Sequence, residues 1–144
     1  MQKQKTNSFE ITVRDARTEI NVWGKTLQNL FLHALQGLAY HIAPSALAEN
    51  THKKKVTEKI LVEAVDINSL LVEFLSEVIA RADIRGAIFT DAAFERFGEN
   101  FLEGEIIGIE TEERERTVEG VSYEELEIKK DPKTGQFEAI IYFM

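Results

Sequence analysis

The chain has 144 residues, a length at which a single domain can bury a hydrophobic core without disulfides or metals. It contains no cysteine, which excludes disulfides, thiolate zinc sites and cysteine nucleophiles. Its 25 acidic residues outnumber its 17 basic residues and give a net charge of −8, so direct binding to nucleic acid is not expected. No stretch approaches the ~18 consecutive apolar residues of a membrane span, and the polar N-terminus does not resemble a signal peptide. We therefore expect a cytoplasmic protein with no membrane contact and one domain over residues 1–144.

The first third of the chain predicts two strands followed by a helix. Apolar and polar residues alternate over residues 9–14 and again over 20–22, which indicates β-strands. From residue 27 to residue 42 the apolar period becomes helical, with Thr26 placed to cap the helix and Pro44 to end it.

The rest of the chain predicts a third strand, a second helix and further strands. Residues 56–64 suggest the strand, and Asp66 offers an N-cap for a helix with a continuous apolar stripe. Short apolar segments follow near residues 88–94, 102–109, 121–128 and 137–143. Turn-forming residues at 131–135 predict a C-terminal hairpin. We predict an α+β fold, a two-layer sandwich with two helices packed on one face of a mostly antiparallel sheet.

The sequence contains no recognisable catalytic constellation. The histidines His33, His41 and His52 do not have the spacing of a zinc site, and we interpret each as a surface or boundary residue. No nucleophile elbow or phosphate-binding glycine loop is present. Glu103 and Glu105 would share one face of a strand and allow an acid–base pair, but nothing else supports one. We therefore predict no catalytic residues and no enzyme.

Two polar segments allow alternative interpretations. Residues 110–116 alternate glutamates with arginines and could chelate a hard cation, although a solvated strand end is the simpler interpretation. Trp23 precedes the predicted first helix and is expected to anchor the edge of the core, with a binding role as the alternative. Lys25, two residues later, could meet an acidic group of a partner or extend into water.

Three segments resemble the archease family, in the family's order. Residues 23–38 match its pattern of an aromatic residue, Gly-Lys-Thr-Leu, Leu-Phe, Ala and Gly-Leu. Residues 66–77 are similar to its second helix, and residues 121–128 to its Val-Thr-Tyr-His-x-Leu-x-Val strand. The resemblance implies a strand-helix-strand-strand module that acts as an accessory protein. Archeases activate a tRNA-splicing RNA ligase by promoting its guanylylation, so the implied partner is an RNA ligase.

The chain departs from the family at the positions that would bind metal. The family motif Asp-His-Thr-Ala-Asp aligns with residues 15–19, where alanine replaces the histidine and Glu19 replaces the second aspartate. Its strand histidine falls on Glu124, and its penultimate aspartate falls on Phe143, next to the terminal Met144. The resemblance implies a divalent cation such as calcium at these positions. Because the ligand set is altered, we expect metal binding to be weak or absent.

The resemblance leads to two principal hypotheses. The first is an accessory protein that engages an RNA ligase, with Asp15, Arg17, Glu19 and Lys25 as partner-binding residues. The second is a divergent binding or chaperone-like module of the same fold, with a different protein or a small molecule as its partner. The apolar and basic residues at positions 16, 17 and 143 motivate the second hypothesis. An enzyme using the Glu103/Glu105 or Glu19/Glu124 carboxylates is a third, less supported hypothesis.

Overall fold

The computed structural model of the chain describes residues 2–6, 8–15, 17–48 and 53–144, with only the backbone described for residues 2–5, 47 and 48. Ala16 and His52 lie outside the described residues. The elements along the chain are β1 (Gln2–Lys5), β2 (Phe9–Arg14), β3 (Arg17–Gly24), α1 (Leu27–Ile42), α2 (Pro44–Ala48), β4 (Lys55–Glu63), α3 (Ile67–Arg85), β5 (Ala87–Phe97), β6 (Phe101–Glu110), β7 (Lys129–Lys130) and β8 (Phe137–Phe143). No helix of the described residues is long and apolar enough to cross a membrane.

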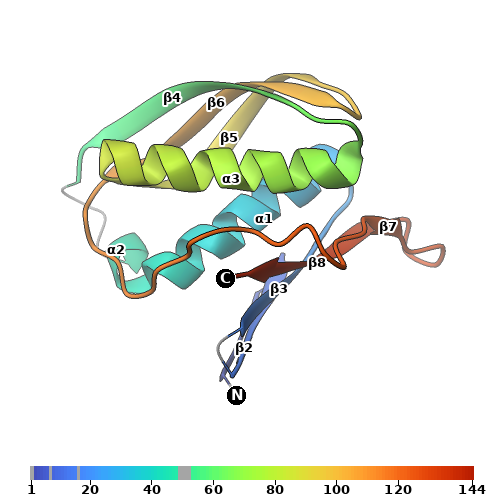
Figure 1. Cartoon of the computed structure of the whole chain (residues 1–144), viewed down its shortest axis with the longest axis horizontal. Coiled ribbons are helices and arrows are strands. Elements are labelled where there is room, and N and C mark those ends of the chain that lie inside the picture. The colour runs from blue at the N-terminus through green and yellow to red at the C-terminus, as the bar shows by residue number, and fades with distance from the viewer. Residues whose placement is uncertain (1, 7, 16, 49–52) are drawn as a thin grey trace.

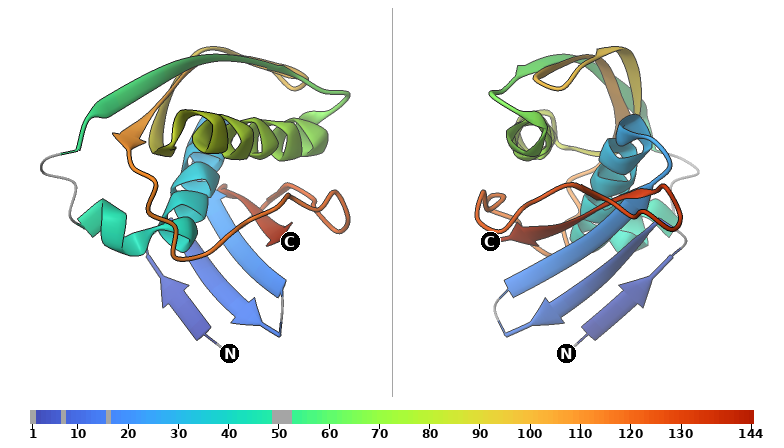
Figure 2. Two further views of the ribbon diagram at one scale, coloured as in Figure 1. Left: turned by 60° about the vertical axis from the view of Figure 1, so that its left-hand side comes forward. Right: turned by 90° about the vertical axis from the view of Figure 1, so that its right-hand side faces the viewer.

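The described strands form two antiparallel sheets, with the helices α1 and α3 between them (Figures 1 and 2). The five-stranded sheet has the order β1-β2-β3-β8-β7, and the three-stranded sheet has the order β4-β6-β5. Helix α1 packs on β3 and also on β5, whereas α3 packs on the three-stranded sheet. The α+β class and the antiparallel pairing are confirmed. The strands are divided between two sheets, so the helices lie between sheets and not on one face of a single sheet as predicted, and α1 contacts both sheets.

An aromatic cluster joins the two helices to the three-stranded sheet. The Phe31 ring of α1 lies 5.7 Å from that of Phe74 in α3 and 5.0 Å from that of Phe97 in β5. Phe94 completes the cluster at 5.7 Å from Phe74 and 5.3 Å from Phe97, between ring centroids. On the other side of α1, Gly37 packs against Ile20 of the five-stranded sheet. These contacts bury α1 between the two sheets.

The predicted helix caps are confirmed. The Thr26 side chain accepts a hydrogen bond from the Asn29 N–H, and the Asp66 side chain accepts one from the Ser69 N–H. Gly24 lies at the strand-to-helix junction because a side chain would collide with the first turn of α1, where a Cβ atom would come within 2.6 Å of the Leu30 nitrogen. The glycine is therefore required by close backbone approach.

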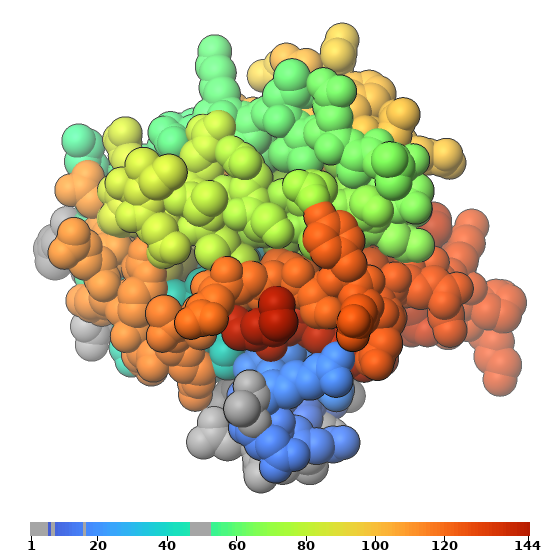
Figure 3. Space-filling view, viewed as in Figure 1, coloured from blue at the N-terminus to red at the C-terminus, as the bar shows by residue number. Residues whose placement is uncertain are grey.

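The prediction of a strand over residues 121–128 is wrong. Only Val121 forms an isolated bridge, to Phe143, and residues 111–128 instead form an irregular strap that crosses from β6 to β7. Figure 3 shows that this strap lies between α3 and the C-terminal strand on the face in view. Its polar groups are satisfied by separate elements, since the Ser122 N–H donates to the Tyr142 carbonyl at 2.9 Å and the Ile128 N–H to Asn68 Oδ1 at 2.9 Å. The predicted C-terminal hairpin is confirmed as β7 and β8.

Candidate functional site

The five-stranded sheet has an inner face against α1 and an opposite, outer face. Ile20 and Val22 of β3 are fully buried on the inner face. Because side chains alternate along a strand, Arg17 and Glu19 lie on the outer face. In the neighbouring strand β8, Tyr142 lies directly opposite Glu19 and shares that face.

The turn between β2 and β3 places Arg17 at one end of the sheet. Arg14 and Arg17 form the last cross-strand pair before the turn. Asp15, in the turn, has a φ of 56°, a left-handed conformation that aspartate tolerates better than most residues. The segment aligned with the family motif therefore begins in the hairpin turn and continues into the first residues of β3.

Four side chains meet on the outer face, namely Arg17, Glu19, Glu125 and Tyr142, and we call them the Arg17 cluster. The Arg17 guanidinium carbon lies 3.8 Å from the centroid of the Tyr142 ring, a cation–π contact. Its Nη2 atom lies 3.4 Å from Glu125 Oε2. Glu125 comes from the strap, where its φ of 65° is again left-handed. Three separate segments thus build the cluster.

The electrostatics of the Arg17 cluster act on the Tyr142 hydroxyl. Desolvation raises the pKa of Tyr142 above its ordinary value, and the carboxylates of Glu19 and Glu125 raise this pKa further. The Arg17 charge acts in the opposite direction and lowers the same pKa. Tyr142 therefore keeps its proton at neutral pH. Its hydroxyl is a neutral group in the field of the Glu19 and Glu125 carboxylates.

The positions that match the family's metal site are not all brought together. Phe143 pairs with Thr18, is only 2% exposed and points to the inner face, whereas Glu19 points to the outer face. Glu124 is exposed on the strap, and the next residue, Glu125, is the one that reaches Arg17.

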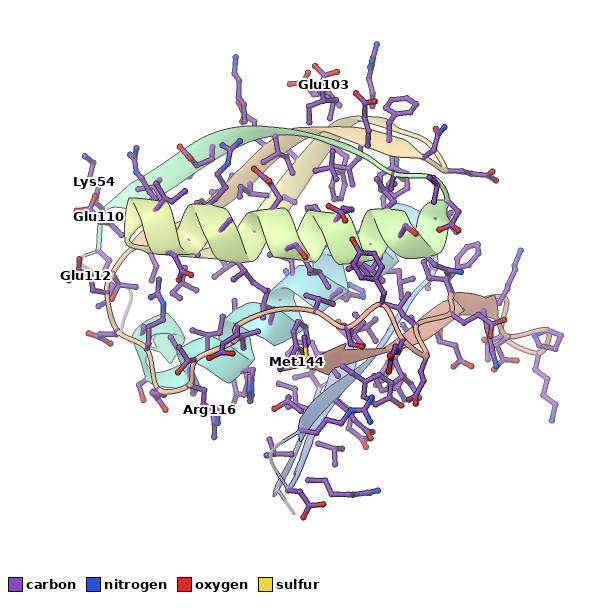
Figure 4. All side chains as sticks on the ribbon, in the orientation of Figure 1. Lys54, Glu103, Glu110, Glu112, Arg116 and Met144 are labelled. Atoms are coloured by element: carbon purple, nitrogen blue, oxygen red, sulfur yellow. The ribbon has the colours of Figure 1, made fainter. Side chains whose placement is uncertain are left out.

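Met144 follows the last residue of β8 and lies beside the strap (Figure 4). The residue is 68% exposed, while its backbone N–H donates to the Gly120 carbonyl at 3.0 Å. Lys25 lies past the opposite end of β3, ~25 Å of extended chain from Arg17. Of the predicted partner-binding residues, Asp15, Arg17 and Glu19 are therefore neighbours and Lys25 is not.

A groove adjoins the Arg17 cluster, between β8 and the strap, with a volume of about 220 Å³. Its lining residues are Asn21, Glu125, Glu127, Lys129, Glu138, Ala139, Ile140 and Tyr142. Ile140 is 40% exposed, so an apolar surface lies among charged side chains. This groove extends the cluster along the outer face.

The carboxylates considered for acid–base chemistry lie on the three-stranded sheet and are matched by basic residues. Glu103 points outward there, at the top of Figure 4, and α3 lies between it and Met144 in that view. Its Oε2 atom lies 3.2 Å from Arg96 Nε, and Glu105 lies across from Lys59 on β4. The two glutamates therefore face basic partners.

Residues 110–116 start at the end of β6 and are mostly exposed, as expected for a solvated strand end, but their arginines also bind backbone carbonyls. Arg114 donates to the carbonyls of Ala82 and Ala87 at 3.3 and 3.0 Å, and Arg116 donates to the His41 carbonyl at 3.1 Å. These bonds fix the start of the strap to the ends of α3 and α1.

The interpretation of His41 as a surface or boundary residue is wrong. The residue is only 5% exposed, and its Nε2 atom lies 3.3 Å from Thr18 Oγ1. Desolvation, with a smaller contribution from the Arg116 charge, lowers the pKa of His41 to about 4. His33 is partly buried and its Nδ1 donates to the Trp23 carbonyl at 2.6 Å.

A divalent cation does not fit the donor set at the family's positions. Phe143 has no lone pair and faces away from Glu19, and the guanidinium of Arg17 already lies beside the Glu125 carboxylate. In the part of the chain that the structure describes, no three His, Asp or Glu side chains are grouped to hold a metal ion.

Sequence reasoning missed Tyr142 and Glu125. Strand alternation could have identified Tyr142, since residues 142 and 143 of a terminal strand must point to opposite faces. No sequence signal identifies Glu125, whose position depends on the irregular path of the strap.

The comparisons with known proteins agree on one family. The model of the archease protein family (MTH1598/TM1083) matches residues 9–143. The solution structure of Methanobacterium thermoautotrophicum protein 1598 is similar, with a TM-score of 0.67 and 20% identity, over 96% of this chain and 99% of that one. The crystal structure of an archease and possible chaperone (TM1083) from Thermotoga maritima has a TM-score of 0.59 and 13% identity, over 87% of each chain. None of the curated proteins matches the chain.

At these identities the solved structures demonstrate a shared fold only, but the family model covers nearly the whole chain, including the hairpin, the strap and β8. The chain belongs to the archease family.

Proposed function

We propose that this chain is a non-catalytic accessory protein that binds an RNA ligase and promotes its guanylylation between turnovers. Family membership supports an accessory role. The ligase as partner comes from the resemblance of residues 23–38, 66–77 and 121–128 to archease segments.

The observation that carries the proposal is the Arg17 cluster on the exposed outer face. Arg17 and Glu125 have side chains 49% and 60% exposed, so a partner can reach both. Arginine and tyrosine are enriched among the residues that dominate binding energy at protein interfaces. The hairpin, the strap and β8 together hold these groups in one place.

The surrounding charge favours a protein partner over RNA. The groove beside the cluster contains Glu125, Glu127 and Glu138 with Lys129 as its one lysine. Such a surface repels a phosphate backbone but complements a basic protein surface.

A small-molecule partner is less well supported by the same groove. Its volume of about 220 Å³ is below the roughly 300–1,000 Å³ that is usual for small-molecule sites. A thermal-shift screen tests this alternative, since a ligand that binds the folded state raises the melting temperature.

The test of the proposal is ligase guanylylation with purified proteins. The fraction of ligase carrying a covalent guanylate is measured over time with GTP, with and without this chain, together with capture of the ligase by the immobilised chain. We expect Arg17→Ser to weaken capture and slow guanylylation by about 10-fold, the effect of losing one strong interface contact.

Arg96→Ser is the matched control. Arg96 also pairs with a glutamate, Glu103, and also lies over an aromatic ring, that of Phe101 at 5.3 Å, but on the three-stranded sheet. This variant should retain full capture and stimulation. Equal loss in both variants, or no stimulation by the unmodified chain, would contradict the proposal.

A further inference from the structure

We propose that Arg17 is a built-in counter-ion for the Glu19 and Glu125 carboxylates, so that this surface is complete without a divalent cation. The inference concerns the surface used in the proposed function, but its test needs no ligase.

The geometry places one positive charge among three oxygen-bearing side chains. Arg17 Nη2 lies 3.4 Å from Glu125 Oε2, and the guanidinium carbon lies 3.8 Å above the Tyr142 ring. Glu19 is the direct cross-strand neighbour of Tyr142, and all four side chains lie on the outer face. A guanidinium held by the Tyr142 ring and the Glu125 carboxylate stays on the face of the sheet that also carries Glu19.

The same arrangement predicts the effect of removing Arg17. Glu19, Glu125 and the Tyr142 hydroxyl are hard oxygen donors of the kind that calcium prefers. In the native chain the nearby guanidinium repels a second cation. An aspartate in its place would remove that repulsion and add a third carboxylate at the same corner of the sheet.

The experiment measures the melting temperature of purified variants in EDTA and in about 10 mM CaCl₂, a concentration above the Kd of weak calcium sites. The unmodified chain should melt at the same temperature in both conditions. Arg17→Asp should be stabilised by calcium, with an increase of about 3–5 °C. Arg17→Gln, which leaves the two native carboxylates, should show a smaller increase in melting temperature. This variant replaces Arg17→Asp in the test if Arg17→Asp folds poorly.

Two controls make the result specific. Arg96→Asp should not respond to calcium, because Glu103 is the carboxylate that Arg96 pairs with and the ring beneath its guanidinium, that of Phe101, has no oxygen. Adding Glu125→Gln to Arg17→Asp leaves two carboxylates and should reduce the calcium response to about that of Arg17→Gln. Calcium stabilisation of the unmodified chain, or no response in either Arg17 variant, would overturn the inference. A failure of ligase stimulation alone would leave these melting temperatures unaffected, so the two proposals fail separately.

Discussion

His41 shows how one buried side chain makes stability depend on pH. Its pKa is about 4 in the folded chain, against an ordinary value of 6.5, because desolvation and the Arg116 charge disfavour the imidazolium. Between these pH values the unfolded chain binds a proton that the folded chain does not, so stability is full above pH 6.5 and decreases as the pH falls towards 4. The expected loss from His41 is about 3 kcal/mol.

The measurement is the free energy of unfolding by urea, near pH 7.5 and near pH 4.5, for the unmodified chain and for His41→Gln. Glutamine can still reach Thr18 but does not titrate. The variant should therefore lose about 2–3 kcal/mol less than the unmodified chain on acidification. Identical losses in both proteins would show that folding does not shift the pKa of His41.

At the scale of elements, the helices were predictable because their periodicity and caps are local properties of the sequence. Asp66 caps α3 as its position suggested, and Gly86 ends that helix in a left-handed conformation. The sequence predicts a strand over residues 121–128 because Val121 and Leu126 are apolar, and in the strap both are buried as strand residues would be. The hydrogen-bond partners of the strap are distant in sequence. Residues 119–122 form hydrogen bonds with the end of the chain at residues 142–144, and Ile128 forms one with Asn68.

The candidate site also has a part that could be predicted from the local sequence and a part that could not. Arg17 and Glu19 could be located from the sequence because they follow a hairpin turn with a strand on each side. Their separation from Phe143 depends on the register between β3 and β8, which pairs Thr18 with Phe143 and Glu19 with Tyr142. Register between strands more than 100 residues apart is set by the whole core, so it could not be predicted locally.

Strand β6 gives an element-scale prediction because its glycines allow close approach to β5. A Cβ atom at Gly108 would come within 2.0 Å of the Ile88 carbonyl oxygen, beside the register shift in β5. We expect Gly108→Ala to lower the free energy of unfolding by about 2–4 kcal/mol, since backbone must move to relieve the collision. Gly120→Ala in the strap is the control, because its nearest contact would be an ordinary 3.9 Å to Met144. The measurement is the free energy of unfolding by urea for both variants. Equal values would mean that the β5 backbone moves away from the new methyl group at little cost.

For the whole molecule, the shared position of α1 predicts that the two sheets unfold together. The buried residues form one continuous cluster, in which α1 contacts the five-stranded sheet through Gly37 and the three-stranded sheet through Phe31. Neither sheet can therefore lose its helix without exposing the core of the other. The chain provides a local probe, because its one tryptophan, Trp23, lies on β3 of the five-stranded sheet. Tryptophan fluorescence and far-UV circular dichroism, which reports mainly α1 and α3, should give coincident urea transitions. A fluorescence transition at lower urea would instead show that the five-stranded sheet, and with it the Arg17 cluster, separates before the helices melt.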